Sequence, residues 1–327
     1  MGAVAAYILS RMAKSVLVVL AIVVLCFILV RLAPGDPAAI IAGEAGAGDP
    51  AYLDELRGRF GLDRPMVEQL WIYLKGIARL DLGYSYRQQT AVLDLIMQRL
   101  PATLLLTGSA FAFALAAGIC LGAMAARHVG GWVDTLVTVL ALACYAIPIF
   151  WVGLMLILVF SIALDWLPAF GMRTVGVELN SFELALDIGR HLVLPMLTLG
   201  LFYMAVYARL TRASMIEVAD LDFVRTAHAK GLSPARIARV HVLRNALLPV
   251  VTVAGVQAGQ LIGGAVVVET VFAWPGIGRL AFDALLQRDY PVLLGIFFVS
   301  SVLVVIVNLL TDLLYTVIDP RISVATT

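Results

Sequence analysis

Four histidines and three lysines are the side chains around which a metal or nucleotide site would be expected. No histidine is followed by glutamate, so the zinc-binding pattern His-Glu-x-x-His does not occur. A phosphate-binding loop needs Gly-x-x-x-x-Gly-Lys-Ser/Thr. Only Lys14 precedes a serine, with alanine in place of the glycine before it, while Lys75 and Lys230 precede glycine. The sequence therefore predicts no metal, nucleotide or cofactor site in this chain.

Side chains for nucleophilic or thiol chemistry are also scattered. Cys26, Cys120 and Cys144 lie in apolar runs, where a thiol behaves as a small buried hydrophobe. Ser109 follows Gly108, but no base stands at the spacing of a nucleophilic serine motif. We predict that the chain is not an enzyme, because an enzyme would need a metal or a reactive nucleophile.

The clearest local signal lies within residues 212–245. Asp222 is an expected N-cap, and Gly231 is an expected C-terminal cap able to take positive φ. Ser233 followed by Pro234 is an N-cap with proline at the first helical position. These signals predict two short helices joined by a tight turn.

The predicted hairpin carries apolar Phe223, Ile237 and Val240 beside a basic rim. Such a surface suits anionic lipid. It equally suits a groove on a partner protein. Local pattern alone leaves both alternatives open.

The composition of the chain indicates what kind of structural elements hold these residues in place. Hydrophobic residues make up 62% of the 327 and charged residues 14%, whereas about a quarter of the residues are charged in soluble domains. A water-soluble fold could not bury this much apolar surface. The net charge of +1 indicates neither nucleic acid nor a strongly charged partner.

Six segments are long and apolar enough to cross a bilayer as helices, which takes about 20 residues. They are approximately 13–31, 101–124, 132–160, 191–211, 246–268 and 291–317. Pro148 and Pro195 are expected to kink the third and the fourth. The first segment also fits a cleaved secretory signal. We favour a retained span, because the sequence after Val30 gives a poor cleavage site.

Orientation follows from lysine and arginine in short loops, which stay in the cytoplasm. These residues are Arg11, Lys14, Arg127, Arg212, Arg225, Lys230, Arg236, Arg239 and Arg244. With six spans they all fall on one side, so both termini are predicted to be cytoplasmic. Segments 32–100, 161–190 and 269–290 are then outside.

The outer segment 32–100 shows apolar residues at helical spacing. They are Leu53, Leu56, Phe60, Val67, Leu70, Trp71, Leu74 and Ile77. Gly61 and Pro65 separate two predicted helices, which we interpret as amphipathic and interfacial, with Trp71 and Tyr73 at headgroup depth. A role in substrate entry is the alternative.

Ionisable residues near the spans are candidates for a gate or a pathway, since charge is costly inside a membrane. Glu269 ends the fifth span, where an outer gate and an interfacial cap are both open. Asp312 lies four residues after Asn308 on the sixth span, so they share a helix face. A structural hydrogen bond is favoured for Asp312 over a pathway role.

Over nearly its whole length the sequence resembles the membrane-spanning subunits of ABC importers for dipeptides, oligopeptides and, in some members, nickel. The matching stretches are Arg31-Leu32-Ala33-Pro34-Gly35-Asp36-Pro37, Asp81-Leu82-Gly83, Arg99-Leu100-Pro101-Ala102-Thr103, 223–233, Leu243-Arg244-Asn245-Ala246-Leu247-Leu248-Pro249, 269–278, Asp312-Leu313-Leu314-Tyr315 and Asp319-Pro320-Arg321. The resemblance implies an all-α membrane protein with about six transmembrane helices and the type I importer permease fold.

The resemblance also implies that the hairpin is a coupling helix that docks into a separate ATPase. Arg225, Thr226 and Ala227 occupy the positions of the family's Glu-Ala-Ala signature, and Gly231 is its glycine. The expected coupling residues are Phe223, Arg225, Thr226, Ala227, Gly231, Leu232, Ser233 and Pro234. Arg225 cannot make the contacts of the signature's glutamate.

The implied partners are a second similar permease subunit, two ATPase subunits that bind ATP and Mg, an extracytoplasmic binding protein and membrane lipid. The implied location is the bacterial inner membrane. We expect residues 1–100 to form the first span and an outer segment, and 101–327 a five-span core that includes the coupling loop. A proton-coupled secondary transporter or channel using Glu269 and Asp312 is the alternative. The solute stays open among dipeptide, longer peptide and nickel chelate.

Overall fold

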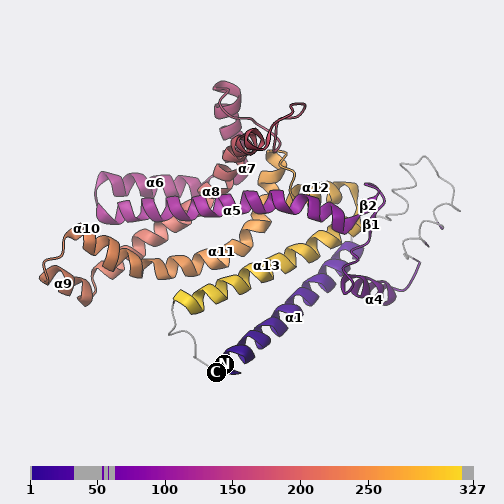
Figure 1. Cartoon of the computed structure of the whole chain (residues 1–327), viewed down its shortest axis with the longest axis horizontal. Helices are drawn as coiled ribbons and strands as arrows, with labels where there is room; N and C mark the ends of the chain where they lie inside the picture. The colour runs from indigo at the N-terminus through magenta and orange to yellow at the C-terminus, as the bar shows by residue number, and fades with distance from the viewer. Residues whose placement is uncertain (1, 33–53, 55–57, 59–62, 319–327) are drawn as a thin grey trace. The chain divides into compact units, whose positions relative to one another are not determined.

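The computed structural model describes residues 2–32, 54, 58 and 63–318 (Figure 1). The first predicted outer helix, around Leu53, Leu56 and Phe60, lies outside the described residues. So does the matching stretch from Asp319 to Arg321. The described residues form two compact units, one of Met1–Pro101 with Leu280–Val305 and one of Ala102–Arg279 with Ile306–Thr327. The first boundary lies close to the predicted one at residue 100, whereas residues 280–305 join the first unit.

The first unit begins with the N-terminal helix. Its elements are α1 (Gly2–Leu32), α4 (Met66–Ile77), β1 (Tyr84–Ser85), β2 (Thr90–Ala91), the start of α5 (Val92–Arg127), most of α12 (Ile277–Gln287) and the first part of α13 (Tyr290–Ile318). The two short strands pair antiparallel, with Tyr84 opposite Ala91.

Helix α4 confirms the second of the two predicted outer helices. It begins after Pro65, which serves as its N-cap residue. Trp71 is exposed, as expected of an interfacial side chain, but Tyr73 is half-buried and stacks on Phe27 of α1 at 5.7 Å between ring centroids. The Tyr73 hydroxyl donates to the carbonyl of Leu294 at 3.1 Å. Tyr73 therefore packs within the unit through its ring and its hydroxyl group.

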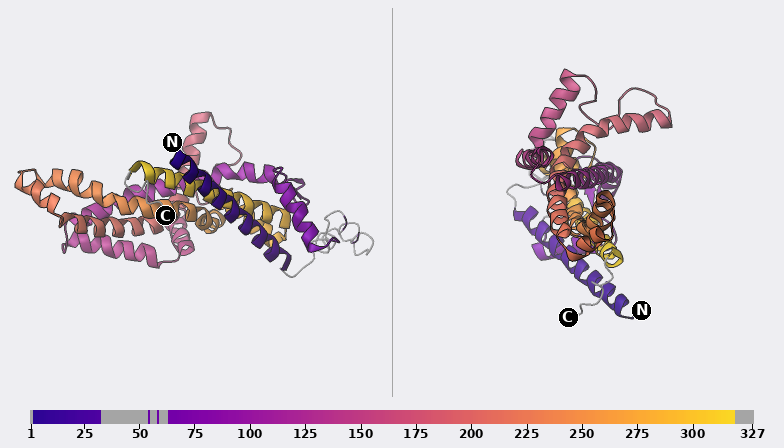
Figure 2. Two further views of the ribbon diagram at one scale, coloured as in Figure 1. Left: turned by 90° about the horizontal axis from the view of Figure 1, so that it is seen from below. Right: turned by 90° about the vertical axis from the view of Figure 1, so that its left-hand side faces the viewer.

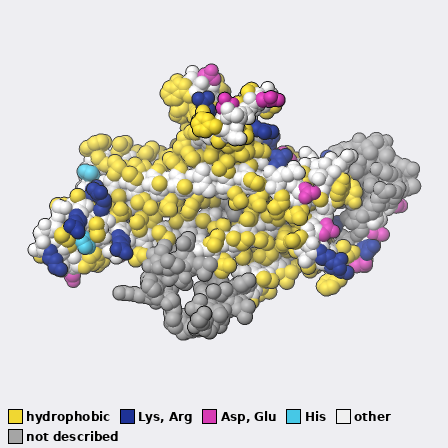
Figure 3. All heavy atoms as spheres, in the orientation of Figure 1, with side chains coloured by type: hydrophobic (Ala, Val, Ile, Leu, Met, Phe, Trp, Pro, Cys, Tyr) yellow, Lys and Arg dark blue, Asp and Glu magenta, His cyan; other side chains and the backbone are white. Residues whose placement is uncertain are grey.

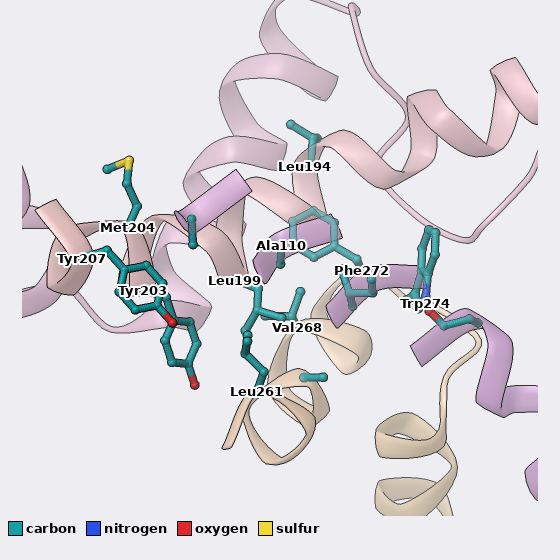
Figure 4. Close-up of a cluster of buried hydrophobic side chains, with 14 of the residues drawn as sticks. Ala110, Leu194, Leu199, Tyr203, Met204, Tyr207, Leu261, Val268, Phe272 and Trp274 are labelled. Atoms are coloured by element: carbon teal, nitrogen blue, oxygen red, sulfur yellow. Dashed lines mark hydrogen bonds between the residues drawn. The ribbon is translucent and has the colours of Figure 1, made fainter. Parts of the chain in front are cut away.

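The second unit is a bundle of long helices, α5, α6, α8 and α11, that run side by side (Figures 1 and 2). The further elements are α6 (Trp132–Ala146), α7 (Ile149–Leu156), the π-helical segment Ile157–Ala163, α8 (Ser181–Ala219), α9 (Asp222–Ala229), α10 (Pro234–Arg236), the π-helical segment Ile237–Leu243 and α11 (Arg244–Val271). An apolar core joins α5, α8 and α11, and includes Ala110, Leu199, Tyr207 and Val268 (Figure 4).

Five of the described helices are long and apolar enough to cross a membrane, and a bent pair raises the number to six if it is one span. The five correspond to every predicted span except 132–160. That region is α6 followed by α7 and the first π-helical segment, with an angle of 106° between the two parts. The predicted span is therefore not one continuous helix, and it counts as one crossing only if the bent pair crosses once.

The bend lies at Ile147 and Pro148, both of which are extended, with ψ angles of 134° and 133°. Proline disfavours the α conformation for the residue before it and cannot donate a backbone hydrogen bond. The predicted kink at Pro148 is thus confirmed as a complete break. Pro195, expected to kink the next span, lies inside the single helix α8.

Candidate functional site

The hairpin of residues 222–236 has the turn that the sequence predicts. Helix α9 ends at Ala229, and Gly231 has a φ of +74°. Its amide donates to the carbonyl of His228 at 2.9 Å. Ser233 is the N-cap residue of α10, and Pro234 stands at the first helical position. Backbone preferences within a few residues were enough to specify this turn.

The predicted cap at the other end of α9 is wrong. Leu221 occupies the N-cap position, and Asp222 is the first residue of the helix. The Asp222 carboxylate lies 3.4 Å from the guanidinium of Arg225, and both side chains are largely exposed. An exposed pair of this kind contributes little to stability.

The second arm of the hairpin is continuous with a predicted span. Helix α10 runs directly into the π-helical segment Ile237–Leu243, which runs into α11. One uninterrupted helical stretch therefore extends from Pro234 to Val271. Local π-helical turns occur frequently at functional positions, and this one lies between the hairpin and the span.

One face of the hairpin is buried against the bundle. Val224 and Ala227 of α9 join Ile237, Val242 and Ala246 in an apolar cluster with Met215 of α8. Ala123 and Ala126 of α5 pack against the same cluster. The expectation that Ile237 belongs to the exposed surface is wrong, because its side chain points into this cluster.

The opposite face of the hairpin is exposed. Phe223, Arg225, Thr226 and Val240 lie on it. Basic side chains gather at this end of the second unit (Figure 3), and they include Arg225, Lys230, Arg236 and Arg239. An exposed aromatic ring among cations has the character of a protein-docking surface.

Glu269, a candidate gate residue, is fully buried at the end of α11. Its carboxylate accepts hydrogen bonds from the Thr103 hydroxyl at 2.7 Å and from the Arg279 amide, in the first turn of α12, at 3.0 Å. An anion at a helix N-terminus is stabilised by the orphan amides and the helix dipole. The surroundings match those of a cap.

The loop between α11 and α12 is fixed around this carboxylate. The Thr103 hydroxyl also accepts from the amide of Ile277 at 2.8 Å, and the Trp274 indole donates to the Ala102 carbonyl at 2.8 Å. A Cβ on Gly276 would overlap the Glu269 carboxylate. We call Glu269, Thr103, Trp274, Ile277 and Arg279 the Glu269 clamp.

Asp312, the other candidate, lies on α13 with Asn308, so the predicted shared helix face is present. The Asp312 side chain lies outside the described residues.

Three histidine rings each lie within hydrogen-bonding distance of the carbonyl four residues earlier in the chain, at 2.8–3.0 Å. They are His128, His191 and His228. Among the described residues no three His, Cys, Asp or Glu side chains form a group that could hold a metal ion.

An ion pair that sequence reasoning missed lies between α6 and α8. Arg212 donates from Nε to Asp134 at 2.5 Å and from a terminal nitrogen at 2.9 Å. The two residues are 78 positions apart, and neither stands in a recognisable motif. The fork of two parallel hydrogen bonds is the strong form of such a pair.

Together, the long apolar helices and the bundle that they form define a class, namely integral membrane proteins built from membrane-spanning helices. A family model described as "Binding-protein-dependent transport system inner membrane component" matches residues 118–324, and its N-terminal companion matches residues 4–107. The chain belongs to this family and is a multi-pass membrane protein.

Two relatives match almost end to end. The chain is 42% identical over 315 residues to the di/tripeptide transport system permease protein DppB of Pseudomonas aeruginosa, covering 92% of this chain and 94% of that protein. It is 41% identical over 333 residues to the dipeptide transport system permease protein DppB of Escherichia coli K12, covering 97% and 98%.

The fold also matches a solved structure. A chain of the MetNI methionine ABC transporter in an inward-facing conformation aligns with a TM-score of 0.52 and 17% identity, covering 69% of this chain and 96% of that chain. At this identity the likeness concerns the fold, which is the type I importer permease fold.

Proposed function

We propose that this chain is one transmembrane subunit of an ATP-driven importer for dipeptides or related short peptides. The observation that carries the proposal is the hairpin, packed on one face against α5 and α8 and exposed on the other. The names of the relatives supply the solute class.

The exposed face of the hairpin is the proposed docking surface for an ATPase subunit. Phe223 supplies the apolar anchor, and Arg225 and Thr226 lie beside it on the first helix. A buried aromatic anchor with a polar rim is the usual arrangement at protein interfaces. The sequence contains no phosphate-binding loop of its own, which fits a nucleotide bound by another chain.

The continuous helix from Pro234 to Val271 supplies the proposed coupling route. The hairpin lies at one end of it, and Glu269 lies near the other. Because a helix transmits displacement along its axis, closure of the ATPases would tilt α11 and carry the clamped loop 272–279 with it. Alternating access then follows from movement of the bundle around a path shared with a second permease subunit.

The complete assembly we propose holds two permease subunits, two ATPases with ATP and Mg, and a binding protein that delivers the peptide outside. Both termini and the hairpin are placed in the cytoplasm on the distribution of short-loop arginines and lysines. The clamped loop 272–279 would face the binding protein.

The experiment replaces Gly231 with valine in the assembled complex. Valine at a φ of +74° is strained by about 1–2 kcal/mol, and no neighbour lies within 4 Å of the added Cβ, so the damage is confined to the turn. We expect loss of dipeptide uptake and of substrate-stimulated ATP hydrolysis, with normal membrane insertion.

Gly176 offers a matched control, because it has a φ of +84° and equally open surroundings in the segment after the first π-helical turn. Gly176→Val should leave substrate-stimulated ATP hydrolysis intact.

Copurification tests the alternative function, a proton-coupled secondary transporter or channel. A stable complex with an ATPase chain supports the importer, whereas proton-coupled flux from this chain alone in liposomes would overturn it.

A further inference from the structure

In the ion pair between Asp134 and Arg212, the Asp134 carboxylate is buried and the Arg212 guanidinium is partly exposed. The Asp134 side chain is 7% exposed and that of Arg212 is 33% exposed. Removing one partner of a buried pair leaves an uncompensated charge, which is far costlier than the loss of an exposed pair. The geometry therefore holds α6 and α8 in one register at this point.

Asp134 also fixes the turn that precedes α6. Its second oxygen accepts the amide of Gly130 at 3.0 Å, and the Gly131 amide donates to the His128 carbonyl at 2.8 Å. Asp134 lies in the first turn of α6, where an anion is favourable. The carboxylate thus links the α5–α6 turn, the start of α6 and the side of α8.

The same stretch of α8 is in direct contact with α5. A Cβ on Gly122 would lie 2.7 Å from Thr211 Cβ and 3.1 Å from the amide of Arg212. The backbones of α5 and α8 therefore meet at the residues next to the ion pair. Three helices are joined within one turn of Arg212.

Of the three helices α5, α6 and α8 that meet near Arg212, only α6 contributes no described residue to the apolar cluster beneath the hairpin. The cluster beneath the hairpin draws its described residues from α5, α8, α9, the α9–α10 turn, α11 and the second π-helical segment, and none of them from α6. Arg212 precedes the hairpin by ten residues of the same chain. The ion pair accordingly adds a polar connection to the packing of α6 along α8, the helix that leads into the hairpin.

At its other end α6 leads through the bend into α7, which packs on α8 and α11. A Cβ on Gly153 of α7 would lie 3.1 Å from Phe272 and 3.4 Å from Val271. Phe272 is two residues before Trp274 of the Glu269 clamp. The α6–α7 pair therefore spans from the ion pair to the clamped loop.

We propose that Asp134 and Arg212 are a positioning pair that makes α6 and α7 move with α8 when the hairpin moves. This inference rests on the proposed function, because it assigns the pair a part in coupling ATP hydrolysis to transport. Without the pair, α8 and α11 would respond to the ATPases while α6 and α7 lag behind.

The test uses the full reconstituted importer carrying Asp134→Asn or Arg212→Gln. The measured quantity is radiolabelled dialanine transported per ATP hydrolysed. We expect this ratio to fall by at least about fivefold, the lower end of typical coupling effects. Because the residues act as one unit, the double variant should be no worse than either single variant. Arg212→Lys should restore part of the ratio.

A second readout follows the helices themselves. Spin labels at Leu136 of α6 and Ala213 of α8, both exposed, report their separation with and without trapped nucleotide. The unchanged complex should keep one narrow distance, whereas Asp134→Asn should broaden it in the trapped state. This distance measurement does not depend on which solute the importer carries.

Arg209→Gln is the matched control, since this arginine is exposed on α8 three residues before Arg212. A pair that only stabilises the fold would lower the yield of complex and leave both the transport ratio and the distance unchanged, which overturns the inference. An unchanged importer that transports no dialanine would instead overturn the proposed solute class, while the distances would still decide the role of the pair.

Discussion

Glu269 shows how a carboxylate can be kept inside an apolar bundle. Its two described hydrogen bonds come from a hydroxyl and a backbone amide, so the protein supplies donors in place of water. The glycine at 276 leaves the space that the carboxylate fills. The side chain therefore holds the loop between α11 and α12 in place.

We predict that Glu269→Ala destabilises the second unit by about 3 kcal/mol, because buried donors lose their acceptor and a cavity forms. Glu269→Gln keeps one acceptor oxygen and should cost about half as much. Thermal unfolding in detergent and protease cleavage within 272–279 measure both effects.

Glu217→Ala, which removes an exposed carboxylate from α8, provides the control and should change stability by less than about 0.5 kcal/mol. A Glu269→Ala protein as stable and as protease-resistant as the control would contradict the capping role.

Asp289 should make the stability of the first unit depend on pH. Burial raises the pKa of this carboxyl above its usual range, and the hydrogen bond donated by Ser85 at 2.5 Å offsets the rise only in part. A raised pKa in the folded state means that folding favours the protonated form. Stability is therefore full below the unfolded pKa and declines as pH rises through the folded value.

Asp289→Asn removes this titration and keeps a good helix-capping residue before α13. We expect the variant to exceed the unchanged protein in unfolding temperature at pH 8, with the difference shrinking toward pH 4. Comparing the two proteins at each pH isolates this group. A difference independent of pH would show that Asp289 is ionised without penalty.

The residues that sequence could predict are those whose conformation is decided locally. Gly231 and Pro234 encode the hairpin turn through their own backbone preferences. The burial of Ile237 was missed because it depends on Met215 of another helix. Thr103 could not be paired with Glu269, 166 positions away, and hydrophobic periodicity carries no information about such a partner.

At the level of elements, the crossing of α5 and α8 depends on small residues. Ala110, Ala114, Gly118 and Gly122 recur every four residues on α5, and all are buried. A Cβ on Gly118 would lie 2.6 Å from Tyr207 Cβ. Close backbone approach through such residues is a main source of helix association in membranes.

We predict that Gly122→Ala costs about 2 kcal/mol, because the new methyl group meets α8 backbone that cannot move aside. Gly108→Ala on the same helix meets nothing within 4 Å and should be neutral or slightly stabilising. Thermal unfolding of the purified chain compares the pair. Equal melting temperatures for the two variants would contradict this crossing.

The break between α6 and α7 shows that hydrophobicity alone does not predict where a helix is interrupted. Residues 132–160 are mostly apolar, so length and hydropathy indicated one span. Pro148 indicated that the helix is distorted there but not by how much, since a proline is compatible with a kink or with a full break. Pro195 illustrates the other outcome, because α8 accommodates it without ending.

For the whole molecule, the bent pair decides which side of the membrane each later segment occupies. If residues 132–163 cross once, the hairpin follows four crossings and shares the side of the N-terminus. If they re-enter, the hairpin follows three crossings and lies opposite the N-terminus. Short-loop arginines on both the N-terminal segment and the hairpin favour a full crossing.

We therefore predict that Val129 and Val240 face the cytoplasm and Val175 faces outward. All three side chains are exposed, at 59%, 49% and 92%, so single cysteines there are suitable for labelling once Cys26, Cys120 and Cys144 are replaced. A membrane-impermeant maleimide added to intact spheroplasts should label only position 175. Labelling of position 240 alone would instead show a re-entrant pair, and would put the hairpin beyond the reach of a cytoplasmic ATPase.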